Sequence, residues 1–298
     1  MNKGIIAINK PKGWTSFDVV NKIKHSVKPN KVGHLGTLDP MATGVLLVTV
    51  GKATKLFDIM QQKQKTYVAT FEFGYETDSL DATGNVVKTN KEIPTQAQIE
   101  QVLTKFIGKI SQIPPLFSAK SVNGVRAYEM ARRGETFELK PKEVEVFEIK
   151  IIDYYNKVLK LEIVCGSGTY IRSIGRDIAY ELNTCATMNE LIRTKVGKFS
   201  VENCIKIEDV TKENVYEKIC SLNEVLDYQV LDLGNDITNK LLNGQVVKID
   251  VEDGNYFIKN ENDIVAIIVV ANLKAKMSIF LAWIIVNNQK VWYTKRVN

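Results

Sequence analysis

The segment GHLGTLDPMATGVL, residues 33–46, concentrates residues that could do chemistry. Three glycines, one of the two histidines of the chain and an Asp-Pro pair lie within these fourteen residues. Two interpretations of Asp39 are open. Asp followed by Pro is typical of a helix N-cap with proline at the first helical position, where the missing N–H is no loss. Alternatively, a carboxylate held on a glycine-bounded loop could act as a nucleophile. Spacing alone favours the helix cap, so the rest of the chain must decide.

The histidine and cysteine content predicts no metal site. The chain has two histidines and four cysteines, and no C-x-x-C pair occurs among them: His25, His34, Cys165, Cys185, Cys204 and Cys220. Zinc sites bring such ligands together at characteristic short spacings. We therefore expect free, buried thiols, and any chemistry must use carboxylate, phenol, guanidinium and ammonium groups.

Other catalytic signatures are also missing from the sequence. The run from Gly44 to Lys52 has six residues between its glycines and is followed by alanine, so it is not a phosphate-binding P-loop. Asp78 and Asp81 lack the spacing of a calcium-binding loop. There is no G-x-S-x-G motif, and no second carboxylate stands out as the partner of Asp39 that a glycosidase would need.

The segments on either side of residues 33–46 are predicted to be regular structure. Thr15 precedes a run with helical spacing and is its expected N-cap. The residues expected to face the core from this helix are Phe17, Val20, Ile23 and Val27. VLLVTV, at 45–50, predicts a buried strand. A helix and a strand should therefore flank the loop that carries Asp39.

Periodicity predicts further strands and helices. Residues 65–74 alternate as a strand, with one apolar face made of Tyr67, Ala69, Phe71 and Phe73. A helix over 96–107 has Thr95 as its cap and Gln98 completing a capping box. KLEIVC, at 160–165, is a strand, and GSGTY leads into a helix whose inward residues are Ile174, Ile178 and Leu182. Because the elements do not alternate as βαβ units, we expect an α+β fold with a mixed, mainly antiparallel central sheet and flanking helices.

The chain of 298 residues has room for a large domain and a small one. We expect a catalytic domain over 1–228 and a small β-rich domain over 229–298, where short strands alternate with Gly-Asn and Asn-Asp turns. Residues 114–142 are irregular and basic, with a short helix near 126–133 that ends at Gly134. This segment is predicted to be an excursion from the first domain.

Positive charge is concentrated at the start of the chain. Residues 1–71 contain eleven lysines and three aspartates, a net charge of +8, whereas the whole chain carries +6 and the remainder therefore −2. Such asymmetry would draw a polyanion such as nucleic acid to one side. Solvated lysines on helix faces would give the same count. The apolar run near the N-terminus is too short for a signal peptide, and no stretch is long enough to span a bilayer, so we expect a cytoplasmic protein without membrane contact.

Six segments, in order along the first 200 residues, resemble the TruB-type tRNA pseudouridine synthases of bacteria. They are NKPKGWTS at 9–16, GHLGTLDPMATGVL at 33–46, KTYVATFEFGYETDSLDATG at 65–84, IPPLFSAKSVNGVRAYEMARRG at 113–134, GSGTYIRSIGRDIAYEL at 166–182 and LIRTKVGKF at 191–199. That family isomerises uridine 55 in the T-loop of tRNA, so the resemblance implies a pseudouridine synthase fold and tRNA as the partner. The tail from residue 230 is similar to the small RNA-binding PUA domain of the family, although no sharp motif marks it.

The resemblance also implies roles for individual residues. Asp39 would be the nucleophile, and Arg172 would lie against it and favour its charged form. Tyr67 would stack on the flipped uracil and act as general base for the proton at C5. The reaction breaks the N-glycosidic bond and rejoins the uracil through C5, which requires no metal or cofactor. From the residues alone, core packing is the simpler explanation of Tyr67, and a surface position is the simpler one for Arg172.

Other positions match binding residues of the family. Leu191 would form an apolar wall of the pocket, His34 would fill the gap left by the flipped base, and Lys10 and Pro11 would support the active-site loop. Residues 114–142 would be a mobile thumb that closes on the T-loop. The thumb residues expected to contact phosphates are Arg126, Arg132 and Arg133, for which a solvated helix face is the alternative.

Two other functions remain open at the level of the sequence. One is a non-catalytic RNA-binding or RNA-folding protein on the same scaffold, and a tRNA-folding role could also accompany catalysis. The other is a related synthase that acts on ribosomal RNA. The intact Asp39, Tyr67 and Arg172 favour an enzyme, and the thumb segment with the TYIRS context favours tRNA. We expect a monomer. The sequence leaves open whether Asp39 attacks the anomeric carbon or the uracil ring.

Overall fold

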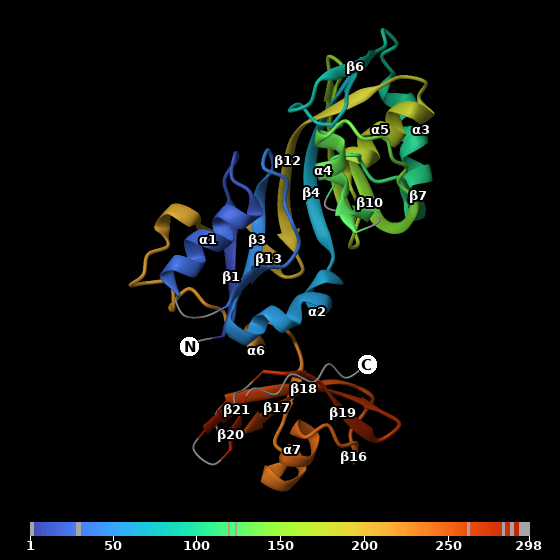
Figure 1. The fold of residues 1–298 in the computed structure, drawn as a ribbon. Helices are drawn as coiled ribbons and strands as arrows, with labels where there is room; N and C mark the ends of the chain where they lie inside the picture. The colour runs from blue at the N-terminus through green and yellow to red at the C-terminus, as the bar shows by residue number, and fades with distance from the viewer. Residues whose placement is uncertain are drawn as a thin grey trace.

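The computed structural model describes residues 3–27, 31–118, 120–122, 124–260, 263–281, 284–286 and 289–291. Its largest element is a ten-stranded mixed sheet (Figure 1). Along the sheet the strands are β14 (Ile205–Lys206), β1 (Gly4–Lys10), β3 (Thr43–Val50), β12 (Ala186–Val196), β4 (Lys65–Phe73), β11 (Val158–Cys165), β10 (Lys142–Tyr155) and β7 (Gly108–Gln112), with β2 (Val32–His34) on β3 and β13 (Phe199–Ser200) on β12. The β1–β14 and β12–β3 pairs are parallel and the other pairs antiparallel, as the sequence predicts.

Helices cover the sheet where their apolar stripes require it. The α-helices are α1 (Ser16–Ser26), α2 (Phe57–Gln61), α3 (Gln96–Leu103), α4 (Ala127–Arg132), α5 (Ile171–Glu181), α6 (Leu222–Val225) and α7 (Gly234–Leu242). The 3₁₀ helices are η1 (Gly51–Leu56), η2 (Thr104–Phe106), η3 (Val201–Asn203) and η4 (Ile207–Asp209). The predicted capping boxes at Thr15 and Thr95 are both present. Helices α3 and α5 pack on β4 and its neighbours and bury the apolar face that the alternation predicts.

One residue of α1 is placed differently from the prediction. Phe17 is 65% exposed, and the buried face of the helix is formed by Val19, Val20 and Ile23, with Val27 just beyond it. Phe17 and Val19 lie on opposite sides of the stripe formed by Val20, Ile23 and Val27, at similar angles from its centre, and the side that carries Val19 faces β1 and β3. The buried face is therefore rotated by part of a turn from the expected one.

The C-terminal part forms its own sheet below the large one in Figure 1. Its strands follow the order β15 (Gln229–Leu231), β17 (Gly254–Asn260), β18 (Asp263–Ala271), β19 (Lys274–Phe280) and β16 (Val247–Lys248). Helix α7 packs on this sheet and was not predicted, because residues 230–298 were interpreted as strands and turns. A core cluster joins both sheets, since Leu47 of β3 and Phe257 of β17 belong to it.

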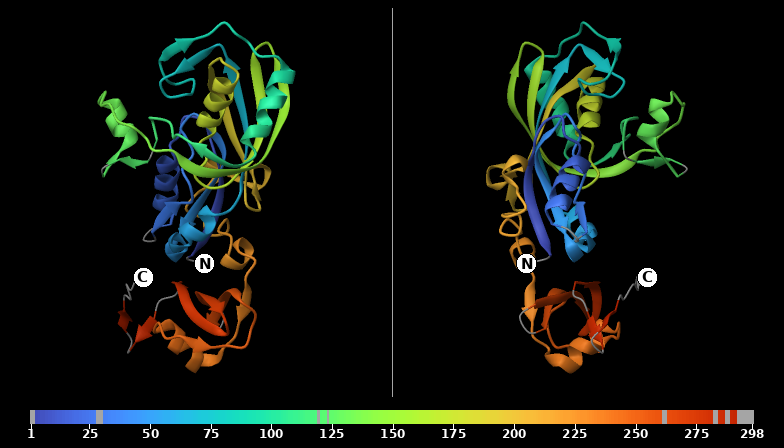
Figure 2. Two further views of the ribbon diagram at one scale, coloured as in Figure 1. Left: turned by 90° about the vertical axis from the view of Figure 1, so that its right-hand side faces the viewer. Right: turned by 60° about the vertical axis from the view of Figure 1, so that its left-hand side comes forward.

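Three small hairpins complete the described chain. They are β5 (Tyr75–Thr77) with β6 (Val86–Thr89), β8 (Ser121–Val122) with β9 (Val125–Arg126), and β20 (Ile284–Val286) with β21 (Gln289–Val291). The β8–β9 hairpin and α4 project from the body of the molecule, as Figure 2 shows, which agrees with the predicted excursion at 114–142. Among the described residues, no helix combines the length and apolar character needed to cross a bilayer.

Candidate active site

Asp39 lies in a tight turn on the loop between β2 and β3. The N–H of Ala42 donates to the carbonyl oxygen of Asp39 at 3.0 Å, and the chain enters β3 at Thr43. The Asp-Pro pair therefore opens a turn, in which proline commonly takes the second position. The helix-cap interpretation of Asp39 is wrong, because a strand, and not a helix, follows the pair.

Buried polar groups hold this loop against the start of the chain. Lys10 is fully buried, and its Nζ donates to the carbonyl oxygens of Pro11 at 2.9 Å, Trp14 at 2.7 Å and Pro40 at 3.3 Å. Burial lowers the pKa of Lys10 to about 8, while the charge of Asp39 acts in the opposite direction. The loop-supporting role expected of Lys10 agrees with these contacts.

Arg172 links Asp39 to a second carboxylate. Its Nε lies 3.0 Å from Oδ2 of Asp39, and its Nη1 lies 3.3 Å from Oδ2 of Asp81. Nη1 also donates to the Ser79 carbonyl at 3.0 Å and Nη2 to the Phe117 carbonyl at 3.1 Å. The structure thus brings together Asp39 and Arg172 as expected. The side chain of Asp39 remains 32% exposed, so its second face is open to a substrate.

Asp81 was not singled out by the sequence, although it is the more buried partner of Arg172. Its Oδ1 accepts hydrogen bonds from the Ser79 hydroxyl at 2.9 Å and from the Thr83 N–H at 3.0 Å. The signal for it was the turn composition of DSLDATG, in which a carboxylate surrounded by Ser and Thr is typical of a side chain that caps backbone N–H groups. Its Oδ2 is left to orient Arg172.

A cavity of about 260 Å³ opens beside Asp39. It is lined by the loop at 36–39, by β4 and β12, by the segment 166–172 that leads into α5, and by Phe117 and Ser118 at the root of the excursion. Its volume corresponds to about nine waters at roughly 30 Å³ each, which is space for one flat nucleobase. Ser118 Oγ is buried and has no hydrogen-bond partner among the described residues, so it could meet a polar edge of a base.

Tyr67 and Leu191 line the same cavity, from β4 and β12 respectively. Both are buried, and burial raises the pKa of the Tyr67 phenol. The site-residue expectations for Asp39, Arg172, Tyr67 and Leu191 therefore coincide at one place. Two cations in the lining, Lys65 and Arg193, were not singled out. For Arg193 the available signal was its alternation with Leu191, which places a charge on the buried face of a strand.

Comparisons with known proteins identify the family of the chain. Residues 24–171 match the TruB family pseudouridylate synthase (N terminal domain), and residues 172–235 match the tRNA pseudouridylate synthase B C-terminal domain. The chain belongs to the TruB family of pseudouridylate synthases. It is 39% identical over 272 residues to a tRNA pseudouridine synthase B of Borreliella afzelii, covering 90% of this chain and 95% of that protein. It is 42% identical to the Rickettsia akari protein of the same name, covering 83% of this chain and 86% of that protein.

Solved structures share the fold of this TruB-family chain. A chain of an H/ACA RNP bound to a substrate RNA containing 2′-deoxyuridine is 21% identical and has a TM-score of 0.68, covering 94% of this chain and 85% of that chain. A chain of a Cbf5-Nop10-Gar1 complex has the same TM-score at 23% identity, covering 94% of this chain and 84% of that chain. At these identities the likeness establishes the pseudouridine synthase fold and nothing finer.

Not every expected binding residue of the TruB-family chain lies at the cavity. His34 ends β2 and is not among the lining residues; its Nδ1 is buried without a partner among the described residues, and burial lowers the pKa of its ring. Arg133 is exposed on the excursion, 3.5 Å from a carboxylate oxygen of Glu135. Arg126 and Arg132 lie in β9 and α4, but their side chains are outside what the structure describes.

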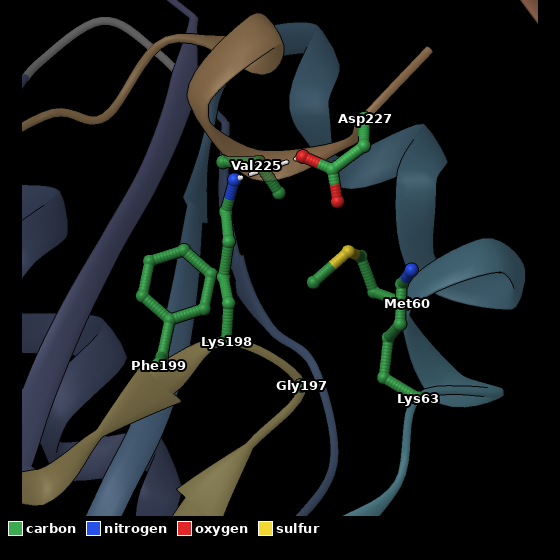
Figure 3. Close-up of a pocket in the computed structure, with 7 residues that line it drawn as sticks. All are labelled: Met60, Lys63, Gly197, Lys198, Phe199, Val225 and Asp227. Carbon is green, nitrogen blue, oxygen red and sulfur yellow. Dashed lines mark ion pairs between the residues drawn. The ribbon is translucent and has the colours of Figure 1, made fainter.

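A second, smaller cavity of about 190 Å³ is formed between α2, the β12–β13 turn and the segment that contains α6 (Figure 3). The Lys198 Nζ and an Asp227 carboxylate oxygen are 3.6 Å apart beside it. This ion pair is exposed, with 42% of the Lys198 side chain and 88% of the Asp227 side chain accessible, whereas Arg172 and Asp39 pair at the edge of a larger cavity, so we assign the site to the Asp39 cavity. Among the described residues, no group of three or more His, Cys, Asp or Glu side chains could hold a metal ion.

Proposed function

We propose that this chain converts uridine 55 in the T-loop of tRNA to pseudouridine. The observation that carries the proposal is the 3.0 Å ion pair between Asp39 and Arg172 at a base-sized cavity. The curated relatives are named tRNA pseudouridine synthase B, which supports tRNA as the substrate class. The T-loop and position 55 follow from the resemblance of the six sequence segments to that family.

Asp39 is the nucleophile in this proposal. The guanidinium of Arg172 favours the ionised carboxylate by charge and hydrogen bond, and Oδ1 of Asp39 is left for attack. A covalent intermediate divides the breaking of the N-glycosidic bond and the making of the C5 bond into two easier steps. Attack on the anomeric carbon and attack on the uracil ring both fit this geometry. The nucleoside keeps all its atoms, so the steps need no redox cofactor.

Tyr67 and Leu191 bind the flipped uracil between them, and Tyr67 takes the proton from C5. Stacking of a base on an aromatic ring contributes about 1–3 kcal/mol, whereas extruding the nucleotide costs a few kcal/mol. These two contributions nearly cancel. Contacts to the RNA backbone must therefore supply the net affinity. His34 occupies the gap that the flipped base leaves in the T-loop.

In this proposal, the contacts to the RNA backbone come from the thumb and from the C-terminal domain. Residues 114–142 act as a thumb that closes on the T-loop, with Arg126, Arg132 and Arg133 contacting phosphates. Its root is already joined to the site, because the Phe117 carbonyl accepts from Arg172. Residues 1–228 form the catalytic domain and residues 229–298 a PUA-like RNA-binding domain, and the protein acts as a cytoplasmic monomer.

The proposed activity is tested on an unmodified tRNA transcript and on the same transcript with cytidine at position 55. After incubation with the purified chain, the RNA is treated with a carbodiimide whose adduct survives mild alkali only on pseudouridine, because the isomer has the same mass as uridine, and the adduct is located by mass spectrometry of nuclease fragments. We expect one pseudouridine, at position 55, in the first transcript and none in the second. Pseudouridine elsewhere in the first transcript, or none at all, contradicts the assigned substrate site. A ribosomal RNA fragment included as competitor identifies the alternative substrate class.

A further inference from the structure

Arg193 is a buried cation that forms an ion pair with no carboxylate among the described residues. It is 1% exposed and is among the largest fully buried side chains of the described chain. Arg172 meets two carboxylates, but among the ion pairs of the described residues none involves Arg193. A guanidinium removed from water without a counter-charge is costly. The groups around Arg193 must therefore compensate for this cost.

The hydrogen bonds of Arg193 explain part of its placement. Its Nε donates to the Val45 carbonyl at 2.7 Å, Nη1 to the Thr37 carbonyl at 3.3 Å and Nη2 to the Gly36 carbonyl at 3.2 Å. The last two carbonyls lie just before Asp39 on the same loop. Gly44 is also fitted to this residue, since a Cβ there would lie 2.2 Å from the Arg193 carbonyl oxygen. Neutral carbonyls satisfy the donors but do not balance the charge.

The ionisable side chain directly opposite Arg193 in the sheet is that of Tyr67. The two residues are direct cross-strand partners in the antiparallel β12–β4 pair, and both line the Asp39 cavity. Side chains of such partners share one face of the sheet, with Cβ atoms about 4.5–5.5 Å apart. Burial raises the pKa of Tyr67, and the charge of Arg193 is the strongest influence in the opposite direction.

The other charged groups around this pair do not replace Arg193. Asp39 and Cys165 raise the pKa of Tyr67, so they oppose a phenolate. Lys65, Lys10 and His34 are cations or potential cations whose pKa values are lowered, by burial first and by the charge of Arg193 second or third. Arg193 is therefore the permanent positive charge on this side of the phenol.

We infer that Arg193 is a positioning residue for proton transfer: its fixed charge favours the phenolate form of Tyr67, and its hydrogen bonds hold the backbone before Asp39. This inference rests on the proposed function. The phenol of Tyr67 first loses its proton to water. Once the anomeric carbon has left N1 and formed its bond to C5, the phenolate oxygen takes the C5 proton, and the electron pair of that C–H bond restores the ring double bond. N1 takes one proton from water, and the phenol returns the C5 proton to water, so the phenolate is regenerated and the protons balance.

The test is the single-turnover rate of Arg193→Met on tRNA transcripts carrying hydrogen or deuterium at C5 of the target uridine. A nearby opposite charge shifts a pKa by about 1–3 units, so removing it should slow the reaction by about 10- to 1,000-fold at neutral pH. Proton removal then limits the rate, and the deuterium isotope effect rises above that of the wild type. A slower reaction with an unchanged isotope effect overturns the inference and leaves Arg193 as a scaffold only.

Two matched variants keep the test decisive. Arg193→Lys keeps a cation but loses the planar fork, so we expect a lower rate with a wild-type isotope effect. A deuterium isotope effect as large as that of Arg193→Met contradicts the role of charge. Arg176→Met removes a partly buried arginine that bonds the Ile113 carbonyl outside the cavity, and its isotope effect should be that of the wild type. Tm and tRNA affinity are measured for each variant as checks of folding.

A chemical rescue provides a second, independent readout. A fluorinated tyrosine incorporated at position 67 has a more acidic phenol, so it should restore at least about tenfold of the rate lost in Arg193→Met, equivalent to about one pKa unit. No rescue contradicts the inference. If the wild type itself forms no pseudouridine, the proposed function fails instead, and the two failures are thereby distinguished.

Discussion

The two ends of β3 carry cations in different settings. At the Asp39 end, the cations are buried and hydrogen-bonded: Lys10, Arg172 and Arg193. At the other end, Lys52 of η1 is partly exposed and Lys55 is exposed, and their Nζ atoms lie 4.5 Å and 5.8 Å from the ring centroid of Phe280 in β19. Burial and the charges of Lys55 and Lys3 lower the pKa of Lys52 to about 8. The cations at the Asp39 end hold the groups of the site in place, whereas those of η1 concentrate positive charge beside the small sheet.

This difference shows how burial changes what a positive charge does. In a low-dielectric site each cation is tied to named acceptors, because an unpaired buried charge is expensive. A partly exposed cation contributes a screened, long-range attraction and a modest contact with an aromatic ring. Substitutions at the Asp39 end should therefore affect turnover strongly, and substitutions at the Phe280 end should affect it little.

The largest effect is expected for Arg172→Met. Turnover should fall by about 10³-fold or more, as for removal of a group that acts as a unit with the nucleophile. The free energy of unfolding should also fall, by about 3–5 kcal/mol, because Asp81 keeps a buried charge without its partner. Single-turnover kinetics and thermal melts measure both. The double variant with Asp81→Asn should regain stability but not turnover; near-normal turnover of either variant would mean that the Asp39–Arg172 pair is not used.

A smaller effect is expected for Asp81→Asn. The amide keeps the size of the side chain but loses the charge that orients Arg172, so turnover should fall by about 10- to 100-fold, near the cost of one charge-assisted hydrogen bond of about 1.5–3 kcal/mol. Asp78→Asn is the matched control, because Asp78 lies in the same turn and its carboxylate accepts from the backbone N–H and the side-chain amide of Asn85, away from Arg172. Equal losses in the two variants would show that the turn, and not the Asp81 charge, is important.

The titration of Lys10 should appear as an alkaline loss of activity. Above its pKa of about 8, the amine has two protons for three carbonyls, and losing one hydrogen bond worth about 0.5–1.5 kcal/mol predicts a decline of about 2- to 12-fold by pH 9.5. Lys10→Arg stays charged, so its profile should lack this decline.

The same titration predicts no loss of fold. The pKa of Lys10 is lower in the folded chain than in the unfolded one. Below pH 8 the amine is charged in both states, and burying this charge destabilises the folded state. As the pH rises from about 8 to 10.5, the folded chain loses this buried charge and the free energy of unfolding increases. A fall in Tm that accompanies the decline in activity, and is absent in Lys10→Arg, would contradict this account.

The smallest effect is expected for Lys52→Gln, at the other end of β3. Its contact with the Phe280 ring is of a kind worth about 0.5–1 kcal/mol, so turnover should stay within about twofold of the wild type and tRNA affinity should fall slightly, with a shallower salt dependence if a phosphate is contacted. Kinetics at two salt concentrations test this. A loss as large as that of Asp81→Asn would show that the two ends of β3 are coupled.

Local structure near the site could be predicted because local chemistry determines it. The capping boxes at Thr15 and Thr95 and the alternation of Tyr67 with Phe71 all depend on neighbours within a few residues. Phe17 and helix α7 were missed for the opposite reason. The face that a short helix buries, and whether a polar segment folds as helix or strand, depend on the tertiary surface available.

At the site, the sequence identified the groups that react but not those that hold them. Asp39, Tyr67 and Arg172 could be found from motif resemblance, and the structure places all three at one cavity. Asp81 and Arg193 act on them from distant parts of the chain, through an ion pair and through strand register. No spacing along the sequence encodes such contacts, and only the turn chemistry of Asp81 and the alternation around Arg193 hinted at burial.

The central claim is that Asp39 is the nucleophile whose charge Arg172 maintains. Its most direct test is tritium release from a C5-labelled tRNA transcript by wild type and Asp39→Asn, with both proteins above their measured tRNA dissociation constants. The account predicts release at the rate of pseudouridine formation by the wild type, and none above background by Asp39→Asn despite near-normal tRNA binding. Appreciable release by Asp39→Asn would contradict it.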